Sequence, residues 1–433
     1  MSDALVGVLG FLGALFLIGL GVPVAVAMAI AGIIGAIYLG DWGGISFILG
    51  STPYDSVFPY SFSVIPLFVA MGVFAAHAGL SRALFTAINS FVGHRRGGLA
   101  VTTIGACAMF GAICGSSLAT VATIGRVALP EMKRHGYAPS LSTATVAAGG
   151  TLGVLIPPSI LLVIYGLLTQ SSVGKLFVAA LIPGILGAVF YGLAILGRVS
   201  LKPDLAPTTP RLSARERIEA LKTTWPVVLL FVVVIGGIFT GLFSPTEAAA
   251  VGAVGAFALA LFSGELNRQV LRSAVFEIAG LSGMIFFILI GASLFNFFLE
   301  STGLPQMLIG LIEQAGVTPL VVMLMILVFY IILGCFMDSL SVVLMTVPIL
   351  APVALDLGFD LVWFGIIVVT VAEIGLITPP VGMNLFVVQA ASQGVPQSTV
   401  VRGIFPFILA DILRLAVLVA FPALVLWLPG LLF

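Results

Sequence analysis

Asp338 is a carboxylate within a long apolar stretch, and a charge at the centre of a membrane helix costs about 2.5 kcal/mol or more. Serine hydroxyls stand close to it at Ser339 and Ser341, and another hydroxyl pair, Ser116 and Ser117, lies in a different apolar stretch. Carboxylate, hydroxyl and carbonyl oxygens are ligands of hard cations such as sodium. These residue types predict cation binding. The alternative for Asp338 is a protonated or hydrogen-bonded structural carboxyl group.

The two hydroxyl-bearing stretches belong to two copies of one sequence unit, 222 residues apart. Gly153-Val-Leu-Ile-Pro-Pro158 recurs as Gly375-Leu-Ile-Thr-Pro-Pro380, and the same offset carries Ser117 onto Ser339. In both copies Gly, Ser and Pro interrupt apolar helices at matching places. Paired, interrupted hydrophobic segments in two halves are typical of the binding sites of secondary transporters.

Each predicted sodium site combines a helix turn with a helix break. Where a helix stops inside a bilayer, its free backbone groups must face protein or a water-lined cavity, and unwound carbonyls with Ser, Thr or Asn oxygens form a cage for sodium. The first cage is predicted from the turn at Ser116 and Ser117 and from the break that holds Gly153, Pro157 and Ser159. The second is predicted from the turn at Gly334, Asp338 and Ser339 and from the break that holds Gly375, Thr378, Pro379 and Asn384.

A substrate site is predicted at Arg126, Ser117, Asp338 and Asn384. Arg126 follows Ser117 within the same stretch, where the second copy has Pro348, so it breaks the symmetry. A guanidinium that faces a cavity can grip a carboxylate substrate bidentately. The alternative is that Arg126 snorkels to the cytoplasmic headgroups.

Three further acidic residues lie in apolar segments. Glu247 follows Ser244-Pro-Thr and is expected to cap a helix N-terminus. Asp411 and Arg414, three residues apart, are expected to form a local pair on one helix. Glu373 lies one turn before the second break, and it either lines the site or pairs across helices.

The composition predicts an all-α polytopic membrane protein embedded in the lipid bilayer. Hydrophobic residues make up 61% of the 433 residues and charged residues only 8%, whereas a soluble domain carries about 25% charged residues. At about 20 residues per span the chain has room for roughly a dozen crossings or part-crossings. No basic patch with interleaved aromatic residues indicates nucleic acid binding.

Enzyme classes fit poorly. An intramembrane protease needs a Ser–His or Asp–Asp pair within the bilayer, but His77, His94 and His135 lie near span ends and no second midplane Asp is evident. A P-loop ATPase needs Gly-x-x-x-x-Gly-Lys-Ser/Thr, which Gly174-Lys175-Leu176 does not match. The sequence therefore predicts a transporter and not an enzyme.

Basic residues in short loops stay cytoplasmic, and their distribution predicts two repeats of inverted topology. Residues 98–132 are flanked by basic residues on both sides, whereas residues 318–352 lie in a region, 273–401, without Lys or Arg. The first stretch therefore enters and leaves the membrane on the cytoplasmic side, and the second enters from the outside. Both are predicted to be re-entrant helical hairpins whose tips meet near the midplane. The predicted division is a first repeat at 1–197, a cytoplasmic linker at 198–224 and a second repeat at 225–433, each repeat with one hairpin and one broken helix.

Four motifs together resemble the large membrane subunit of tripartite ATP-independent periplasmic (TRAP) transporters. They are Ser244-Pro-Thr-Glu-Ala-Ala-Ala-Val-Gly252, Gly115-Ser-Ser-Leu-Ala-Thr-Val-Ala-Thr-Ile-Gly125, Leu155-Ile-Pro-Pro-Ser159 and Ile377-Thr-Pro-Pro-Val-Gly-Met-Asn384. The resemblance covers nearly the whole chain. It implies a multi-pass protein of the bacterial cytoplasmic (inner) membrane with an elevator-type, ion-transporter-like fold, and sodium-coupled uptake. It also implies a small four-helix membrane subunit and a periplasmic substrate-binding protein that delivers an organic acid, such as a C4-dicarboxylate or a sugar acid.

A self-sufficient elevator-type carboxylate or ion symporter of similar inverted-repeat design is the main alternative. Its sequence would look much the same at the hairpin tips, and a neighbouring reading frame for a secreted binding protein would discriminate the two. A channel is the third possibility, which saturable, sodium-dependent flux would exclude.

Overall fold

The computed structural model describes residues 2–392 and 394–433, and in these residues the chain is helical without strands. Seven of the described helices are long and apolar enough to cross a membrane, or nine if each bent helix pair counts as one span. The predicted all-α polytopic membrane fold is therefore confirmed. Its helices fall into two series that follow one another along the chain.

The first series spans both sides of the first predicted hairpin. Its elements are α1 (Asp3–Gly19), α2 (Val24–Tyr38), α3 (Trp42–Asp55), the 3-10 turn η1 (Tyr60–Ser63), α4 (Val64–His77), α5 (Leu80–Val92), α6 (Gly98–Cys114), α7 (Ser117–Arg134), α8 (Pro139–Leu155), α9 (Ile160–Thr169) and α10 (Val173–Leu201). A polar connection with η2 (Pro203–Leu205) and α11 (Ala214–Lys222) follows.

The second series repeats this order. Its elements are α12 (Trp225–Phe239), α13 (Pro245–Phe262), α14 (Arg268–Ser301), α15 (Leu304–Ala315), α16 (Pro319–Phe336), α17 (Ser339–Asp356), α18 (Leu361–Ile377), α19 (Met383–Ala391), α20 (Gln397–Ala420) and α21 (Ala423–Leu432). Helices α17 and α18 begin and end 222 residues after α7 and α8. The sequence duplication thus extends to the helix boundaries.

One long helix marks where the two series differ. Helix α14 has 34 residues and takes the place of α3, η1 and α4 in the first series. The first series has Pro53 and Pro59 in this stretch, whereas the same offset places Val275 and Leu281 in the second. Proline removes a backbone donor and interrupts a helix, so the first stretch is divided and the second is continuous.

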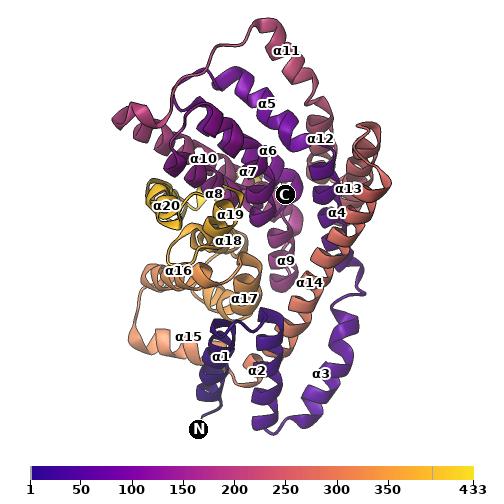
Figure 1. Ribbon diagram of the computed structural model, residues 1–433. Helices are drawn as coiled ribbons and strands as arrows, with labels where there is room; N and C mark the ends of the chain where they lie inside the picture. The colour runs from indigo at the N-terminus through magenta and orange to yellow at the C-terminus, as the bar shows by residue number, and fades with distance from the viewer. Residues whose placement is uncertain (1, 393) are drawn as a thin grey trace.

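The helices pack as two groups. In one group α14 packs against α2 and α4, and α13 packs against α4 and α12; Figure 1 shows α14 along one edge of the molecule with α4 and α13 beside it. In the other group α8 packs against α6, α7 and α20, while α18 packs against α16 and α17. The predicted hairpins belong to this second group.

Both helix breaks lie at the Pro–Pro pairs. Helices α8 and α9 are bent by 43° at the first break, which makes them one broken span. Helix α8 ends at Leu155 and α18 at Ile377, and the Pro157–Pro158 and Pro379–Pro380 peptide bonds are both cis. Because proline lacks a backbone N–H, neither helix can continue through its pair.

Candidate functional site

The first helix turn lies between α6 and α7. Gly115 has a φ of +64°, a left-handed conformation that glycine adopts without strain. Ser116 is the N-cap of α7, since its hydroxyl accepts a hydrogen bond from the N–H of Ala119 at 3.4 Å. Its carbonyl accepts one from the hydroxyl of Thr120 at 2.7 Å. These contacts hold Ser117 in a buried position at the first residue of α7.

The second helix turn lies between α16 and α17, and its N-cap is the carboxylate of Asp338. This carboxylate accepts hydrogen bonds from the N–H of Ser341 at 3.1 Å and from the Ser341 hydroxyl. The positive end of the α17 dipole favours a negative charge here. Asp338 is half-buried, whereas Ser339 and Ser341 are buried. The turn therefore holds an ordered carboxylate at its surface and two hydroxyls beneath it.

Each turn packs against the helix break of its own series. In the second series the N–H of Gly382 donates to the carbonyl of Cys335 at 3.0 Å, and the Cys335 thiol lies 3.7 Å from the carbonyl of Pro379. In the first series Ser159 is the N-cap of α9, accepting from the N–H of Leu162 at 3.3 Å, and is fully buried. A Cβ atom on Gly115 would lie 3.3 Å from the carbonyl oxygen of Pro158, so the first turn also packs against its break.

Glycines bring the helices of each turn and break into backbone contact. A Cβ atom on Gly375 would lie 2.5 Å from the Cα of Gly334, so no side chain fits between α16 and α18 there. In the first series Gly111 contacts Gly153 in the same way. Gly153, Gly334 and Gly375 were predicted as site residues, whereas Gly111 was not. A helix without a glycine at this crossing would push the break away from the turn.

Asn384 joins the two series. Its side-chain N–H donates to the hydroxyl of Ser117 at 2.9 Å and to the carbonyl of Ala147 at 3.1 Å, and the residue is fully buried. Helix α19, which carries Asn384, packs against α7 and α8, and α9 packs reciprocally against α17. The broken helix of each series is therefore attached to the hairpin of the other.

A cavity of about 260 Å³ opens between the two turns, and we call it the tip cavity. Ser116, Ser117, Asp338 and Ser339 line one side of it, and α4 and α14 line the other. Asp338 and Glu277 are its ionisable carboxylates, and among the described lining residues none is Lys, Arg or His. The other predicted sodium-site residues are not among the lining residues: Gly153, Pro157, Ser159, Gly334, Gly375, Thr378, Pro379 and Asn384.

Arg126 lies in a second, neighbouring cavity of about 860 Å³. This cavity is also lined by Arg82, His77 and Glu277, and it shares Ala76, Thr123 and Glu277 with the tip cavity. The Nε of Arg126 donates to the carbonyl of Ala122 at 3.3 Å, and the side chain is exposed. The structure thus separates Arg126 from Ser117, Asp338 and Asn384, with which it was grouped, and places it beyond the tip cavity.

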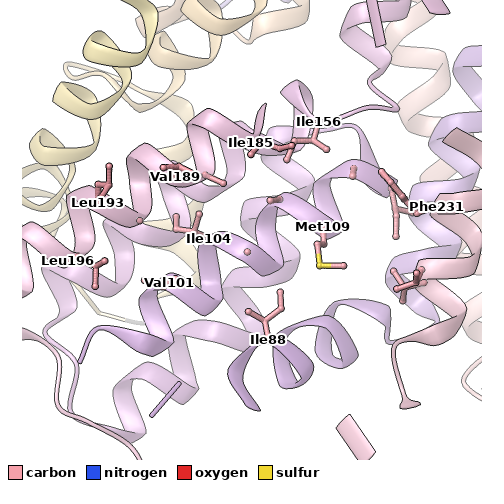
Figure 2. Close-up of a pocket in the computed structure, with 18 residues that line it drawn as sticks. Ile88, Val101, Ile104, Met109, Ile156, Ile185, Val189, Leu193, Leu196 and Phe231 are labelled. Carbon is pink, nitrogen blue, oxygen red and sulfur yellow. The ribbon is translucent and has the colours of Figure 1, made fainter. Parts of the chain in front are cut away.

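A third cavity, of about 610 Å³, has an apolar lining. It lies between α5, α6, α10 and α12, and Figure 2 shows Ile104, Met109, Val189 and Phe231 among the side chains around it. Such a lining offers no partner for a carboxylate, and hydrocarbon suits it better than water. The tip cavity, with its carboxylate and hydroxyl groups, is the better candidate for ion and acid binding.

Glu277 and Glu373 are the residues that sequence reasoning missed or left open. Glu277 lies on α14 where the tip cavity and the second cavity meet, 3.5 Å from His77. Glu373 lies on α18 and is fully buried, and neither carboxylate oxygen has a hydrogen-bond partner among the residues that the structure describes. In the sequence, Glu373 could be noticed because it lies one turn before the Pro–Pro break. Nothing in the sequence around Glu277 pointed to it.

Two secondary expectations are confirmed. Ser244 and Glu247 form a reciprocal capping box at the start of α13, with the Glu247 carboxylate accepting from the N–H of Ser244 at 2.8 Å. Arg414 lies 2.8 Å from Asp411 within α20, and both side chains are fully buried. The first residue pair starts a helix, and the second forms an ion pair in the interior.

The comparisons with known proteins show the family of this chain. Residues 11–424 match the family described as "Tripartite ATP-independent periplasmic transporter, DctM component". The C4-dicarboxylate TRAP transporter large permease protein DctM of Pseudomonas aeruginosa is 39% identical, and the match covers 86% of each chain. The sialic acid TRAP transporter large permease protein SiaM of Vibrio cholerae is 33% identical over 98% of each chain, and the ectoine/5-hydroxyectoine large permease protein UehC of Ruegeria pomeroyi is 34% identical over 98% of each.

Solved structures share the fold at low sequence identity. The YdaH transporter of Alcanivorax borkumensis superposes with a TM-score of 0.65 at 15% identity, covering 90% of each chain. The MtrF protein of Neisseria gonorrhoeae superposes with a TM-score of 0.61 at 14% identity, covering 99% of this chain. At such identities the likeness supports the fold alone.

The family match over nearly the whole chain and the apolar spans identify a transport protein, not an enzyme, that crosses the bacterial inner membrane several times. The chain belongs to the DctM family, the large permease subunits of tripartite ATP-independent periplasmic transporters.

Proposed function

We propose that this chain performs sodium-coupled uptake of an organic acid by an elevator mechanism. It would receive the acid from a periplasmic substrate-binding protein and work with a small four-helix membrane subunit. The observation that carries the proposal is the meeting of two capped helix turns, each packed against a helix break, at one cavity between the two helix groups.

The charges of the tip cavity favour cation coupling. Asp338 and Glu277 line it without a basic side chain among the described lining residues. An organic acid would be repelled by these carboxylates, and cations bound at the turns would reverse that repulsion. Sodium would be held by the carbonyls and hydroxyls at Ser116, Ser117, Gly153, Pro157 and Ser159, and by those at Gly334, Asp338, Ser339, Gly375, Thr378, Pro379 and Asn384.

The position of the tip cavity supports an elevator. Its lining comes from the turns on one side and from α4 and α14 on the other. These two sides belong to the two helix groups, which contact each other through α4 with α6 and α14 with α17. We call the helix group that contains α6, α7, α8, α16, α17, α18 and α20 the hairpin group. If the hairpin group slides along α4 and α14, the tip cavity moves with it and faces alternate sides of the membrane.

Arg126 would act after the acid leaves the turns. Its exposed guanidinium lines the second cavity, which shares residues with the tip cavity. A guanidinium there can bind the carboxylate bidentately on its route to the cytoplasm. Substrate contacts within the tip cavity would then come from Ser117 and Asp338, with Asn384 fixing Ser117 from behind.

We propose a small organic acid or zwitterion as the substrate, as the names of three relatives suggest. Their names specify C4-dicarboxylate, sialic acid and ectoine permeases. All of these compounds carry at least one carboxylate, so a carboxylate is the group we propose for recognition here. A self-sufficient symporter is the alternative, since the same fold occurs in solved proteins that are only 15% and 14% identical to this chain.

The two repeats are proposed to have inverted topology, and cysteine accessibility tests this. Lys133 and Asp356 are both exposed, and they lie at the ends of the equivalent helices α7 and α17. Single cysteines at these two positions should be labelled from opposite sides of the membrane. The native Cys107, Cys114 and Cys335 must be replaced first. A cysteine at the exposed Lys222 is the control for the Lys133 side. Labelling of both loops from the same side would rule the inversion out.

Reconstitution tests the function itself. We expect proteoliposomes with this chain, its small membrane partner and its binding protein to take up the acid when an inward sodium gradient is imposed. Omission of the binding protein should abolish uptake, because the tip cavity would then receive no delivered substrate, and omission of the small membrane subunit should abolish it too. Robust sodium-driven uptake of a free acid by this chain alone would instead favour the self-sufficient symporter, and gradient-independent uptake would remove sodium coupling.

A further inference from the structure

We propose that Glu373 binds a further monovalent cation, held between the two hairpin turns by its carboxylate together with Ser117, Ser339 and Asn384. The proposal rests on the proposed sodium-coupled transport. It adds a site that joins the two repeats, in addition to one cage within each.

Glu373 lies in a completely buried stretch of α18. All residues of α18 from Trp363 to Ile377 are buried, and Glu373 itself has an exposed fraction of 0%. Helix α18 packs against α8, α16, α17 and α20, so protein surrounds it. Glu373 lies two residues before Gly375, where α18 touches the backbone of α16. This carboxylate therefore faces neither lipid nor open water.

The polar neighbours of Glu373 come from both turns. The hydroxyl groups of Ser339 and Ser117 lie next to its carboxyl group, although neither forms a hydrogen bond with one of its oxygens. The two serines are equivalent residues, each the first residue of a hairpin's second helix. A ligand between them would therefore contact both repeats at once.

Asn384 supplies a further unsatisfied oxygen at the same place. Its amide nitrogen donates to the Ser117 hydroxyl and the Ala147 carbonyl, whereas its buried Oδ1 has no partner in the described part of the chain. The set thus has four oxygen-bearing side chains: Glu373, Ser117, Ser339 and Asn384. Three of their oxygen atoms, two from Glu373 and one from Asn384, lack hydrogen-bond partners among the described residues. An oxygen-rich, partner-free set of this kind suits a hard cation.

Among the described residues, no Lys or Arg forms an ion pair with Glu373. The charged groups close enough to affect it are Asp411 and Arg414 of α20. Arg414 lies 2.8 Å from Asp411, so its charge is already balanced. A buried carboxylate without a partner is strongly unfavourable. A bound monovalent cation would offset the free-energy cost of the buried charge. Because its ligands come from both turns, it would bind only when the two turns lie next to each other.

Replacement of Glu373 by glutamine tests the site, because glutamine keeps the size of the side chain and removes its charge. In proteoliposomes with both partners, Glu373→Gln should lower the number of sodium ions moved per substrate by one, as measured from the substrate gradient sustained at a known sodium gradient and membrane potential. Thr370→Val is the matched control. Thr370 is equally buried on α18, but its hydroxyl bonds to the Ile366 carbonyl of its own helix, so coupling should not change.

A binding measurement keeps the test decisive if Glu373→Gln does not transport. Purified Glu373→Gln should bind one sodium ion fewer per chain than the wild type, and Glu373→Asp should bind the full number about tenfold more weakly, because its carboxylate is displaced by one methylene. An unchanged sodium count in Glu373→Gln, with an unchanged coupling ratio where transport persists, would overturn the proposal. If the wild type itself neither binds nor uses sodium, the proposed function fails first.

Discussion

Asp338→Asn should weaken the apparent sodium affinity of uptake about tenfold or more, equivalent to about 1.4 kcal/mol or more, while the protein still folds. Asparagine is as good an N-cap as aspartate, so the hydrogen bond from the N–H of Ser341 to this side chain can remain. What the substitution removes is the negative charge at the tip cavity. Sodium dependence of initial uptake rates in the reconstituted complex measures the effect.

Asp360→Asn is the matched control for Asp338→Asn. Asp360 is also an N-cap, since its carboxylate accepts from the N–H groups of Val362 at 2.7 Å and Trp363 at 3.0 Å. It caps α18 at an exposed position outside the tip cavity. The control should leave the sodium dependence unchanged. Normal expression of Asp338→Asn together with an unaltered sodium response would show that Asp338 is only a helix cap.

The helix turns and breaks could be predicted because their causes are local. Glycine, serine and proline change the backbone wherever they occur, so Ser116, Ser159 and the Pro–Pro pairs mark helix ends in the sequence itself. Because the sequence is duplicated, the helix turn and the helix break each occur twice at matching positions. For the same reason the sequence predicted that Glu247 caps a helix N-terminus, which the structure shows as a reciprocal capping box with Ser244.

The contacts between the repeats could not be predicted in this way. Asn384 meets Ser117 across 267 residues of sequence, and no local pattern specifies that pairing. Glu373 was visible as an acidic residue before a break, but its lack of partners depends on the packing of four other helices. Arg126 was placed correctly in its helix, yet only tertiary packing puts it in the second cavity rather than at the turns.

The buried pair of Asp411 and Arg414 should control the stability of the hairpin group. One carboxylate oxygen of Asp411 lies 2.8 Å from Arg414, and the other accepts a hydrogen bond from the Tyr191 hydroxyl. Tyr191 in turn lies 2.8 Å from the hydroxyl of Thr151. This network connects α20 of the second series to α10 and α8 of the first, close to the break at Gly153.

Arg414→Met should therefore destabilise the protein by about 3–5 kcal/mol, because it leaves the buried charge of Asp411 without its partner. Adding Asp411→Leu should restore most of the lost stability, since replacing a whole buried pair with apolar residues is often neutral. Thermal unfolding in detergent, with the single and double variants compared, measures both effects.

Arg215→Met is the control: Arg215 pairs with Glu219 on the surface of α11, where a solvent-screened pair adds little. If Arg414→Met unfolds at the same temperature as the control, or if the double variant is no more stable than the single one, the pair does not hold α20 to α10 and α8. The stability of the first break would then rest on the glycine contact of Gly111 with Gly153 and not on this network.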